Sequence, residues 1–266
     1  SVENTGDVEQ VFSENENIIT RDYQNDYIYH AQMEPLNAVV SVAPDGQSAE
    51  VWVGSQAHDG ARATAAEVLG LDFTQVKLNP HYLGGGFGRR SMSDYVAEAT
   101  VIANQVKKPV KLIWTREDDL KYGAFRPMSL QRMQAIVEED GNITAWRHRI
   151  IGPGGGLLAS GAKTDFYTFA NQRVEMKDMD HGIRTKHWRA VGHGPNKFAI
   201  ESFIDELATE KGVDPVVMRK QLMRNHSRAI NVLENAVEMS DWGGQVPAGR
   251  ARGIGQHGHV TLKIDG

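Results

Sequence analysis

The sequence contains no cysteine among its 266 residues. This absence excludes disulfides, thiolate metal sites and an iron–sulfur cluster held by this chain. No apolar run approaches the roughly 20 residues that a membrane-spanning helix requires, so we predict no membrane span. Neither sign of charge dominates, because 29 basic and 34 acidic side chains leave a formal net charge of −5. That balance does not favour nucleic acid or a membrane surface as a partner.

The remaining composition, 40% hydrophobic and 24% charged, is typical of a globular protein with a sizeable core. Strand-like and helix-like periods alternate along the chain, which predicts the α+β (mixed α/β) class. We expect two subdomains with a boundary near residues 152–165, where the sequence becomes rich in glycine. The predicted hairpins cover 36–53 and 130–151, and the predicted helices cover 61–69, 91–107, 198–211, a segment starting at Asp214 and 229–239.

One glycine-rich stretch, Gly84-Gly-Gly-Phe-Gly-Arg-Arg90, is the most informative feature of the chain. Glycine lets the backbone approach a flat or anionic group closely, and positive φ angles can point several N–H groups at one spot. A strand is predicted before it over 74–78 and a helix after it over 91–107. The loop is therefore expected near a helix N-terminus, which suits an oxyanion or a phosphate.

Nucleotide-binding motifs do not fit this stretch or the second glycine-rich one. A dinucleotide fingerprint needs a third glycine where Arg89 stands, and a P-loop needs Gly-Lys-Ser/Thr at its end. In the second stretch, 156–164, the lysine lies one residue too far from Gly161 for a P-loop. Taken alone, the first loop is equally compatible with a tight structural turn.

The end of the sequence reads as a strand, Val260–Ile264, followed by a hairpin turn without a second strand. We therefore expect a fragment, or one chain of a larger assembly. His257 and His259 would share a face of this strand, but two ligands without a third are a weak metal signal.

Five short motifs follow one another in the order of a known protein family. They are Gly6–Phe12, the His-x(3)-Glu-Pro stretch Tyr29–Pro35, Val53–Gln56, the Gly-Gly-Gly-Phe-Gly loop Gly84–Gly88, and the aromatic-Arg-x-x-Gly stretch Trp188–Gly192. By these motifs the chain resembles the molybdopterin-binding subunit of the xanthine oxidase/aldehyde oxidoreductase family of molybdenum hydroxylases. Arg89-Arg90, together with Trp188–His193, resembles the isoquinoline 1-oxidoreductase beta-subunit type.

The resemblance implies an incomplete molybdenum-cofactor-binding domain and a molybdenum-dependent oxidoreductase. It implies oxidative hydroxylation of an N-heterocycle or an aldehyde, with oxygen from water and electrons passed to [2Fe–2S] clusters on a partner subunit. The implied cofactor is molybdopterin with molybdenum, in the cytosine dinucleotide form. A cytochrome c acceptor and a periplasmic location are implied as well, with the cytoplasm as the alternative. The substrate itself is not indicated.

The resemblance also assigns roles to individual residues. Gln56 would offer its amide to a metal-bound oxygen, as the catalytic candidate of this chain. Backbone groups of the loop and of the aromatic-Arg stretch would hold the cofactor, and no side chain would ligate the metal. The cofactor-binding candidates are Gly85, Gly86, Phe87, Gly88, Arg89, Arg189 and Ala190. His30 and Glu34 are predicted to be structural, holding their loop against the core.

One element of the family's pattern is missing. The general base is a glutamate in a Gly-x-Gly-Glu-Pro motif, and this sequence has no such motif; its single Glu-Pro pair is Glu34-Pro35, near the N-terminus. We therefore expect the isolated chain to be inactive, with the C-terminal half of the cofactor domain supplied by another chain or segment. The alternative is a non-catalytic binding or assembly module that keeps the fold.

Overall fold

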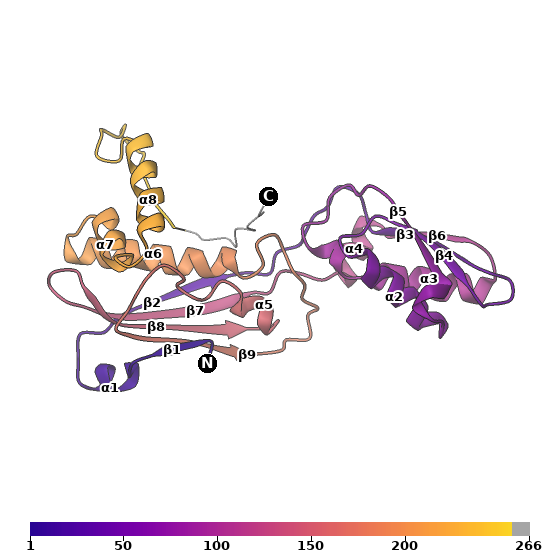
Figure 1. Cartoon of the computed structure of the whole chain (residues 1–266), viewed down its shortest axis with the longest axis horizontal. Coiled ribbons are helices and arrows are strands. Elements are labelled where there is room, and N and C mark those ends of the chain that lie inside the picture. Colours follow the sequence, from indigo (N-terminus) through magenta and orange to yellow (C-terminus); the bar gives the residue numbers. More distant parts are fainter. Residues whose placement is uncertain (257–266) are drawn as a thin grey trace. The chain divides into compact units, whose positions relative to one another are not determined.

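The computed structural model describes residues 1–256, so His257, His259 and the strand expected over 260–264 lie outside the described residues. Two compact units make up the chain (Figure 1). Unit 1 contains Ser1–Asp26, Met128–Asp180 and the chain from Val191 onward, and unit 2 contains Tyr27–Pro127 and His181–Ala190. Helices and strands are mixed in both units, which confirms the predicted α+β (mixed α/β) class.

The boundary predicted near residues 152–165 does not coincide with a crossing between the units. This stretch lies inside unit 1, where the short helix α5 (Gly156–Ala159) packs on strand β8 (Ile143–Gly152). Leu158 and Ala162 are buried there. The glycines therefore mark a tight turn over the sheet, and the chain crosses between the units elsewhere, at 26/27, 127/128, 180/181 and 190/191.

Unit 1 is built on a five-stranded sheet with the strand order β1-β9-β8-β7-β2. The predicted hairpin over 130–151 is confirmed as β7 and β8, and β9 runs parallel to β8. The strands are β1 (Glu3–Thr5), β2 (Ile19–Asn25), β7 (Ser129–Val137), β8 (Ile143–Gly152) and β9 (Asn171–Asp178). The helices are α1 (Val8–Ser13), α5 (Gly156–Ala159), α6 (His193–Lys211), α7 (Pro215–Leu222) and α8 (Ser227–Met239).

The core of unit 1 lies between its sheet and helix α6 (Figure 1). Phe203 of the helix is fully buried against Trp146 of β8, whose ring also stacks on Phe169 at 4.8 Å between centroids. The predicted helix over 198–211 is confirmed, although α6 begins earlier, at His193. Gly212 ends it in the left-handed conformation, with a φ of 65° that glycine adopts without strain.

Unit 2 holds a four-stranded sheet with the order β5-β4-β3-β6. Helices α2 and α3 pack on one face of it, against buried side chains of β3, β4 and β5 and the partly buried Val110 and Leu112 of β6. The strands are β3 (Asn37–Val42), β4 (Ala49–Val53), β5 (Val76–Pro80) and β6 (Val110–Ile113). The helices are α2 (His58–Leu69), α3 (Asp94–Val106) and α4 (Arg116–Tyr122), with short 3-10 turns at η1 (Phe73–Gln75) and η2 (Arg89–Ser91).

The glycine-rich loop lies between β5 and η2, and here the structure corrects one expectation. The helix predicted from residue 91 begins at Asp94, because the 3-10 turn η2 separates it from the loop. The N–H of Arg89 bonds back to the Gly86 carbonyl at 2.8 Å and closes that turn. The loop amides are therefore not those of the first turn of α3, and the expected helix-dipole contribution does not act through them.

Among residues 1–256, no helix combines the length and apolar character that crossing a bilayer requires. The same residues contain no cluster of three or more His, Cys, Asp or Glu side chains suited to a metal ion.

Candidate functional site

The backbone of the glycine-rich loop in unit 2 is sharply bent. Gly85 and Gly88 have φ angles of 95° and 101°, and Phe87 between them has a φ of 51°. A non-glycine residue in the left-handed region costs about 1–2 kcal/mol, so the surroundings must hold Phe87 in place. Strain of this kind is typical of ligand-binding and active sites.

Neighbouring groups leave no room for side chains at three glycines of the loop. A Cβ atom on Gly86 would lie 2.4 Å from Gln56 Oε1, and one on Gly88 would lie 2.2 Å from the His187 carbonyl oxygen. At Gly84 the Cβ would lie 2.5 Å from the Cβ of Glu34. At Gly88 and Gly84 the obstacle is a carbonyl oxygen or a Cβ atom, so these positions require glycine independently of any ligand; at Gly86 it is the flexible end of Gln56, which can move aside.

Gln56 follows strand β4 and lies directly against the loop. Its side-chain Oε1 accepts a hydrogen bond from the Gly88 N–H at 2.9 Å, and its own N–H donates to the Arg90 carbonyl at 3.1 Å. The side-chain Nε2 has no hydrogen-bond partner among the described residues, and the residue is exposed. The structure therefore brings Gln56 and the loop together and leaves an amide donor available.

Three consecutive backbone donors of the loop are also available. Within the described part of the chain, the N–H groups of Gly85, Gly86 and Phe87 have no hydrogen-bond partner. The N–H of Gly88, the fourth predicted cofactor-binding residue of the loop, is engaged by Gln56. The unpaired donors are therefore those of the three residues that precede Gly88.

The two arginines after the loop point into the protein. Arg89 donates two hydrogen bonds to Asp94, at 2.8 and 2.7 Å, and is fully buried. Arg90 is also fully buried and pairs with Glu34 at 2.9 Å, while it donates to the carbonyls of Gly85 and Gly54. With its guanidinium committed to Asp94, Arg89 can contact a cofactor only through its backbone.

Glu34 and His30 hold this region together, as predicted. Partial burial opposes ionisation of Glu34, but hydrogen bonds from the Gly84 N–H and Asn37 and the charge of Arg90 outweigh it and lower the pKa of Glu34. Burial lowers the pKa of His30, whose ring nitrogens face the carbonyls of Ala124 and His187. Both residues link chain segments: His30 is buried between two carbonyls, and the Glu34 carboxylate is engaged by Arg90 and the Gly84 N–H.

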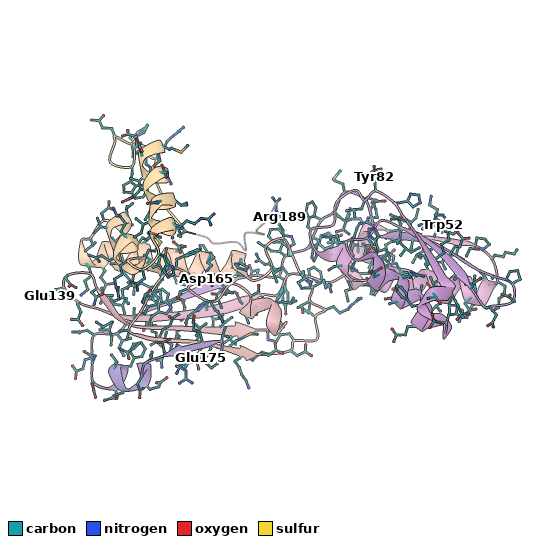
Figure 2. The ribbon with its side chains drawn as sticks, in the orientation of Figure 1. Trp52, Tyr82, Glu139, Asp165, Glu175 and Arg189 are labelled. Atoms are coloured by element: carbon teal, nitrogen blue, oxygen red, sulfur yellow. The ribbon has the colours of Figure 1, made fainter. Side chains whose placement is uncertain are left out.

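The segment His181–Ala190 belongs to the same unit as the loop. It is held by a backbone hydrogen bond from the Lys186 N–H to the Phe125 carbonyl at 2.9 Å. Arg189 is exposed and its side chain extends away from the ribbon (Figure 2). Ala190 has a φ of 70°, which is a second strained non-glycine position among the predicted site residues. Arg189 has no ion-pair partner among residues 1–256.

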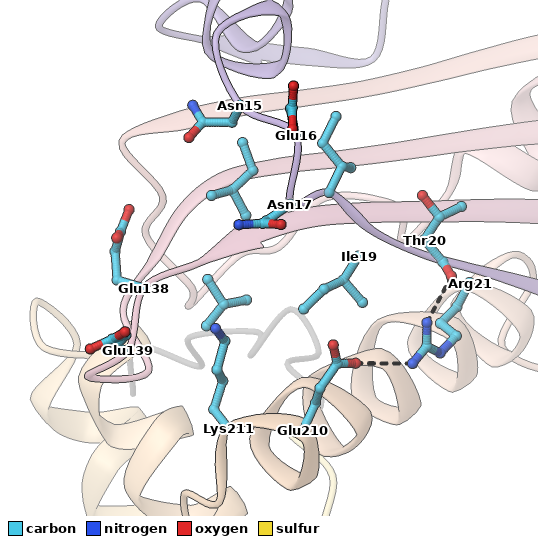
Figure 3. Close-up of a pocket in the computed structure, with 13 residues that line it drawn as sticks. Asn15, Glu16, Asn17, Ile19, Thr20, Arg21, Glu138, Glu139, Glu210 and Lys211 are labelled. Atoms are coloured by element: carbon cyan, nitrogen blue, oxygen red, sulfur yellow. Dashed lines mark hydrogen bonds and ion pairs between the residues drawn. The ribbon is translucent and has the colours of Figure 1, made fainter.

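A large cavity lies elsewhere, in unit 1, and contains none of the predicted site residues. It has a volume of about 840 Å³ and is rimmed by carboxylates that include Glu138 and Glu139 (Figure 3). On one wall Arg21 pairs with Glu210 at 3.0 Å and also donates to its neighbour's carbonyl. The predicted site residues all lie in unit 2, so this cavity is separate from the chemistry that the sequence suggests.

The sequence gives no indication of the acidic side chains that hold Arg89 at the end of the loop. Asp94 forms ion pairs with Arg89 and with Arg184, which comes from a segment distant in the sequence and lies at 2.6 Å. Asp119 is fully buried nearby, 4.0 Å from Arg89. No spacing rule signals these contacts, because the partners come from separate elements that only the fold brings together.

The arrangement suits a flat ligand rich in oxygen or negative charge. It offers three backbone N–H groups and one side-chain amide from a surface that Cβ atoms would obstruct. Neighbouring unpaired donors of this kind can bind oxyanions, carbonyl-like oxygens or metal-bound oxygens. These residues fit the molybdopterin group that the motifs imply, because that group presents oxygen ligands on the metal and polar pterin edges.

Comparison with known proteins gives a consistent result. A family model for the molybdopterin cofactor-binding domain matches residues 1–223 of this chain. The isoquinoline 1-oxidoreductase subunit beta of Brevundimonas diminuta is 32% identical over 269 residues, covering 90% of this chain and 33% of that protein. The aldehyde oxidoreductase molybdenum-binding subunit PaoC of Escherichia coli K12 is 31% identical over 226 residues, covering 81% and 30%.

Among solved structures, quinoline 2-oxidoreductase from Pseudomonas putida 86 superposes with a TM-score of 0.81 at 16% identity. The match covers 89% of this chain and 34% of that one, and at this identity it shows a shared fold. The chain spans about a third of the length of each of these relatives.

Proposed function

The chain belongs to the molybdopterin cofactor-binding domain family, and on that premise we propose that it is the cofactor-holding part of the large subunit of a molybdenum hydroxylase. The proposed reaction is the oxidative hydroxylation of an N-heterocycle or an aldehyde, with water as the oxygen source. The single observation that carries the proposal is the glycine cradle, in which the free amide of Gln56 lies beside the free N–H groups of Gly85, Gly86 and Phe87.

The residues of this chain would act by binding and orienting. The three loop amides would donate to oxygen atoms and polar edges of the cofactor, and Gln56 Nε2 would donate to an oxygen bound at the metal. When bound, the cofactor would accept the two electrons of the oxidation, while the oxygen added to carbon comes from water. Fixed donors stabilise charge that develops on oxygen without having to reorient during the reaction.

Proton removal has to come from outside this sequence. We propose that a glutamate on the chain or segment carrying the C-terminal half of the cofactor domain serves as the general base. Within this chain, His30 and Glu34 are engaged in backbone contacts and an ion pair, so neither is available for that role. The finding that the chain spans about a third of its relatives supports this division.

The remaining parts of the proposal rest on the resemblance. We propose the cytosine dinucleotide form of molybdopterin, a partner subunit with [2Fe–2S] clusters as the electron route, a cytochrome c as the acceptor and the periplasm as the location. The absence of cysteine from the chain supports placing the clusters on another subunit. The alternative, a non-catalytic assembly module, is favoured only if no glutamate-bearing segment accompanies this chain.

Isotope labelling of the full-length protein with its co-purifying subunits tests the proposed reaction. Isoquinoline and an aromatic aldehyde are offered with a dye acceptor in ¹⁸O-labelled water. We expect ¹⁸O in the product, and a roughly ten- to hundredfold lower kcat in Gln56→Ala, since partners of metal-bound groups affect activity on that scale. Gln105→Ala, an exposed glutamine on α3, is the matched control. Oxidised product without ¹⁸O, or no oxidation by a cofactor-loaded protein, would contradict the proposal.

A further inference from the structure

A second group of buried polar side chains lies beside the glycine loop and takes no part in the proposed cofactor contacts. Its centre is Asp119 of α4, which is fully buried. Tyr29 and Gln32 both donate hydrogen bonds to its Oδ2 atom, and Arg116 Nη1 lies 3.4 Å from the same oxygen. One carboxylate oxygen therefore collects donors from two separate segments.

Three polar atoms of this group lack partners. Asp119 Oδ1, Gln32 Oε1 and Arg89 Nε have no hydrogen-bond partner among the described residues, although all three side chains are fully buried. Arg89 Nε lies 4.0 Å from Asp119 Oδ1. This distance is too long for a hydrogen bond but short enough for strong attraction between buried opposite charges.

The group is joined directly to the loop backbone. Arg89 is the residue that follows the last glycine of the loop, and its N–H closes the turn onto Gly86. At the other end of the loop, a Cβ on Gly85 would lie 3.5 Å from the Cβ of Gln32, which is ordinary contact distance. Asp119 thus holds Gln32, against which the loop packs, by a hydrogen bond, and it attracts Arg89, which ends the loop and is itself hydrogen-bonded to Asp94.

The phenol of Tyr29 stays a neutral donor to this carboxylate. Burial, followed by the hydrogen bond to Asp119, raises the pKa of Tyr29 to about 12. The hydrogen bond from its hydroxyl is therefore present throughout the neutral pH range.

We propose that Asp119 is a positioning residue of the candidate site: it fixes Gln32 and Arg89, and through them holds the free amides of Gly85, Gly86 and Phe87 in place before any ligand binds. Its consequence for cofactor binding rests on the proposed function. The order of the loop itself is measurable in the chain without a cofactor.

Asp119→Asn keeps the size and shape of the side chain and removes its charge. If the new NH₂ group faces Arg89, it meets the Nε–H donor; if it faces Tyr29 and Gln32, both must change from donating to accepting, Gln32 by turning its amide. In both orientations the attraction between Asp119 and Arg89 is lost. Glu117→Gln is the matched control, because Glu117 lies on the same helix, is exposed and loses the same charge.

The test is amide hydrogen exchange resolved at single residues in the full chain. The Gly88 and Arg89 amides, bonded to Gln56 and Gly86, report on the loop, and those of α6 in unit 1 report on the rest of the fold. We expect exchange at Gly88 and Arg89 to rise at least tenfold in Asp119→Asn, which corresponds to about 1.4 kcal/mol of local stability. In Asp119→Asn the α6 amides should exchange at wild-type rates. In Glu117→Gln all amides, those of the loop included, should do so.

Unchanged exchange at Gly88 and Arg89 in a folded Asp119→Asn would overturn the proposal. If the amides of Asp119→Asn exchange rapidly throughout unit 2, the whole unit is destabilised and that variant does not test positioning. Tyr29→Phe then provides the test, because it removes one donor to Asp119 and keeps the charge of the carboxylate. A several-fold rise confined to the loop amides supports positioning, and wild-type exchange in Tyr29→Phe overturns it.

A second readout connects the loop to cofactor binding. Pterin and molybdenum contents of the native complex should fall several-fold in Asp119→Asn and stay unchanged in Glu117→Gln. Wild-type protein without pterin would contradict the proposed function, and the exchange data would still judge the positioning role.

Discussion

Replacing Gly88 with alanine gives the sharpest test of how the loop is built. The φ of 101° at Gly88 is unfavourable for an alanine, at a cost of about 1–2 kcal/mol. The new Cβ would also lie 2.2 Å from the backbone oxygen of His187, which cannot move aside by a simple rotation. Displacing the loop would break the hydrogen bond from Gly88 to Gln56, worth about 1 kcal/mol. We therefore expect Gly88→Ala to lower the free energy of unfolding by about 3 kcal/mol or more.

Gly86→Ala is the informative contrast. Gly86 lies outside the left-handed region, and the clash of its Cβ is with the end of the flexible Gln56 side chain, at 2.4 Å. Gln56 can rotate away at the cost of one hydrogen bond. Alanine also restricts the unfolded chain more than glycine does, which stabilises the folded state by about 0.4–1 kcal/mol. The free energy of unfolding should stay within about 1 kcal/mol of wild type.

Urea unfolding of the chain, followed by far-UV circular dichroism, measures both effects. Gly60→Ala is the control, because its Cβ would lie 3.7 Å from the nearest atom within helix α2. A Gly88→Ala variant as stable as Gly60→Ala would refute the reasoning, and so would a Gly86→Ala variant as damaged as Gly88→Ala.

Three further outcomes follow from the same structure. Burial lowers the pKa of His148 to about 3, so its imidazole stays neutral in the folded protein while it takes up a proton below about pH 6.5 in the unfolded chain. The free energy of unfolding should therefore fall by up to about 1.4 kcal/mol per pH unit as the pH falls from about 6.5 towards 3. His148→Gln should flatten the unfolding free energy measured over that window, and an unchanged pH profile would contradict this. Arg90→Met should cost about 1–3 kcal/mol in urea unfolding, because the carbonyls of Gly54 and Gly85 lose their buried donor and the partly exposed Glu34 loses its ion pair; a loss below about 0.5 kcal/mol would contradict it. Phe203→Ala should cost about 3–5 kcal/mol, whereas Val232→Ala, 56% exposed, should change the unfolding free energy by less than about 0.5 kcal/mol.

Much of the architecture could be predicted from hydrophobic periodicity. The helix ended by Gly70, the Asp214-Pro215 helix start and the long hairpin are confirmed, because each carries a strong local signal. Strand β9 (Asn171–Asp178) was missed, since Val174 is its only buried apolar residue and the strand is set by its pairing with β8. The division into two units was misplaced because it depends on long-range contacts.

The candidate site divides in a similar way. Motif order predicts that Gln56 and the loop serve one site, and the structure places them in contact; their direct hydrogen bond, from the Gly88 N–H to Gln56 Oε1, has no signal in the sequence. The direction of the Arg89 side chain could not be predicted, since its partners Asp94 and Asp119 lie at spacings typical of no motif. Their roles in binding stay predictions until a cofactor is measured.

The central claim is that the glycine cradle and Gln56 hold molybdopterin. Its most direct test is the molybdenum and pterin content of the natively purified protein with its partners, by elemental mass spectrometry and by fluorescence of the oxidised pterin. We predict about one molybdenum and one pterin per wild-type and per Gly60→Ala chain, and a loss of at least tenfold in Gly86→Ala, whose fold stays intact. A full complement of pterin in Gly86→Ala, or none in wild type, would contradict the account.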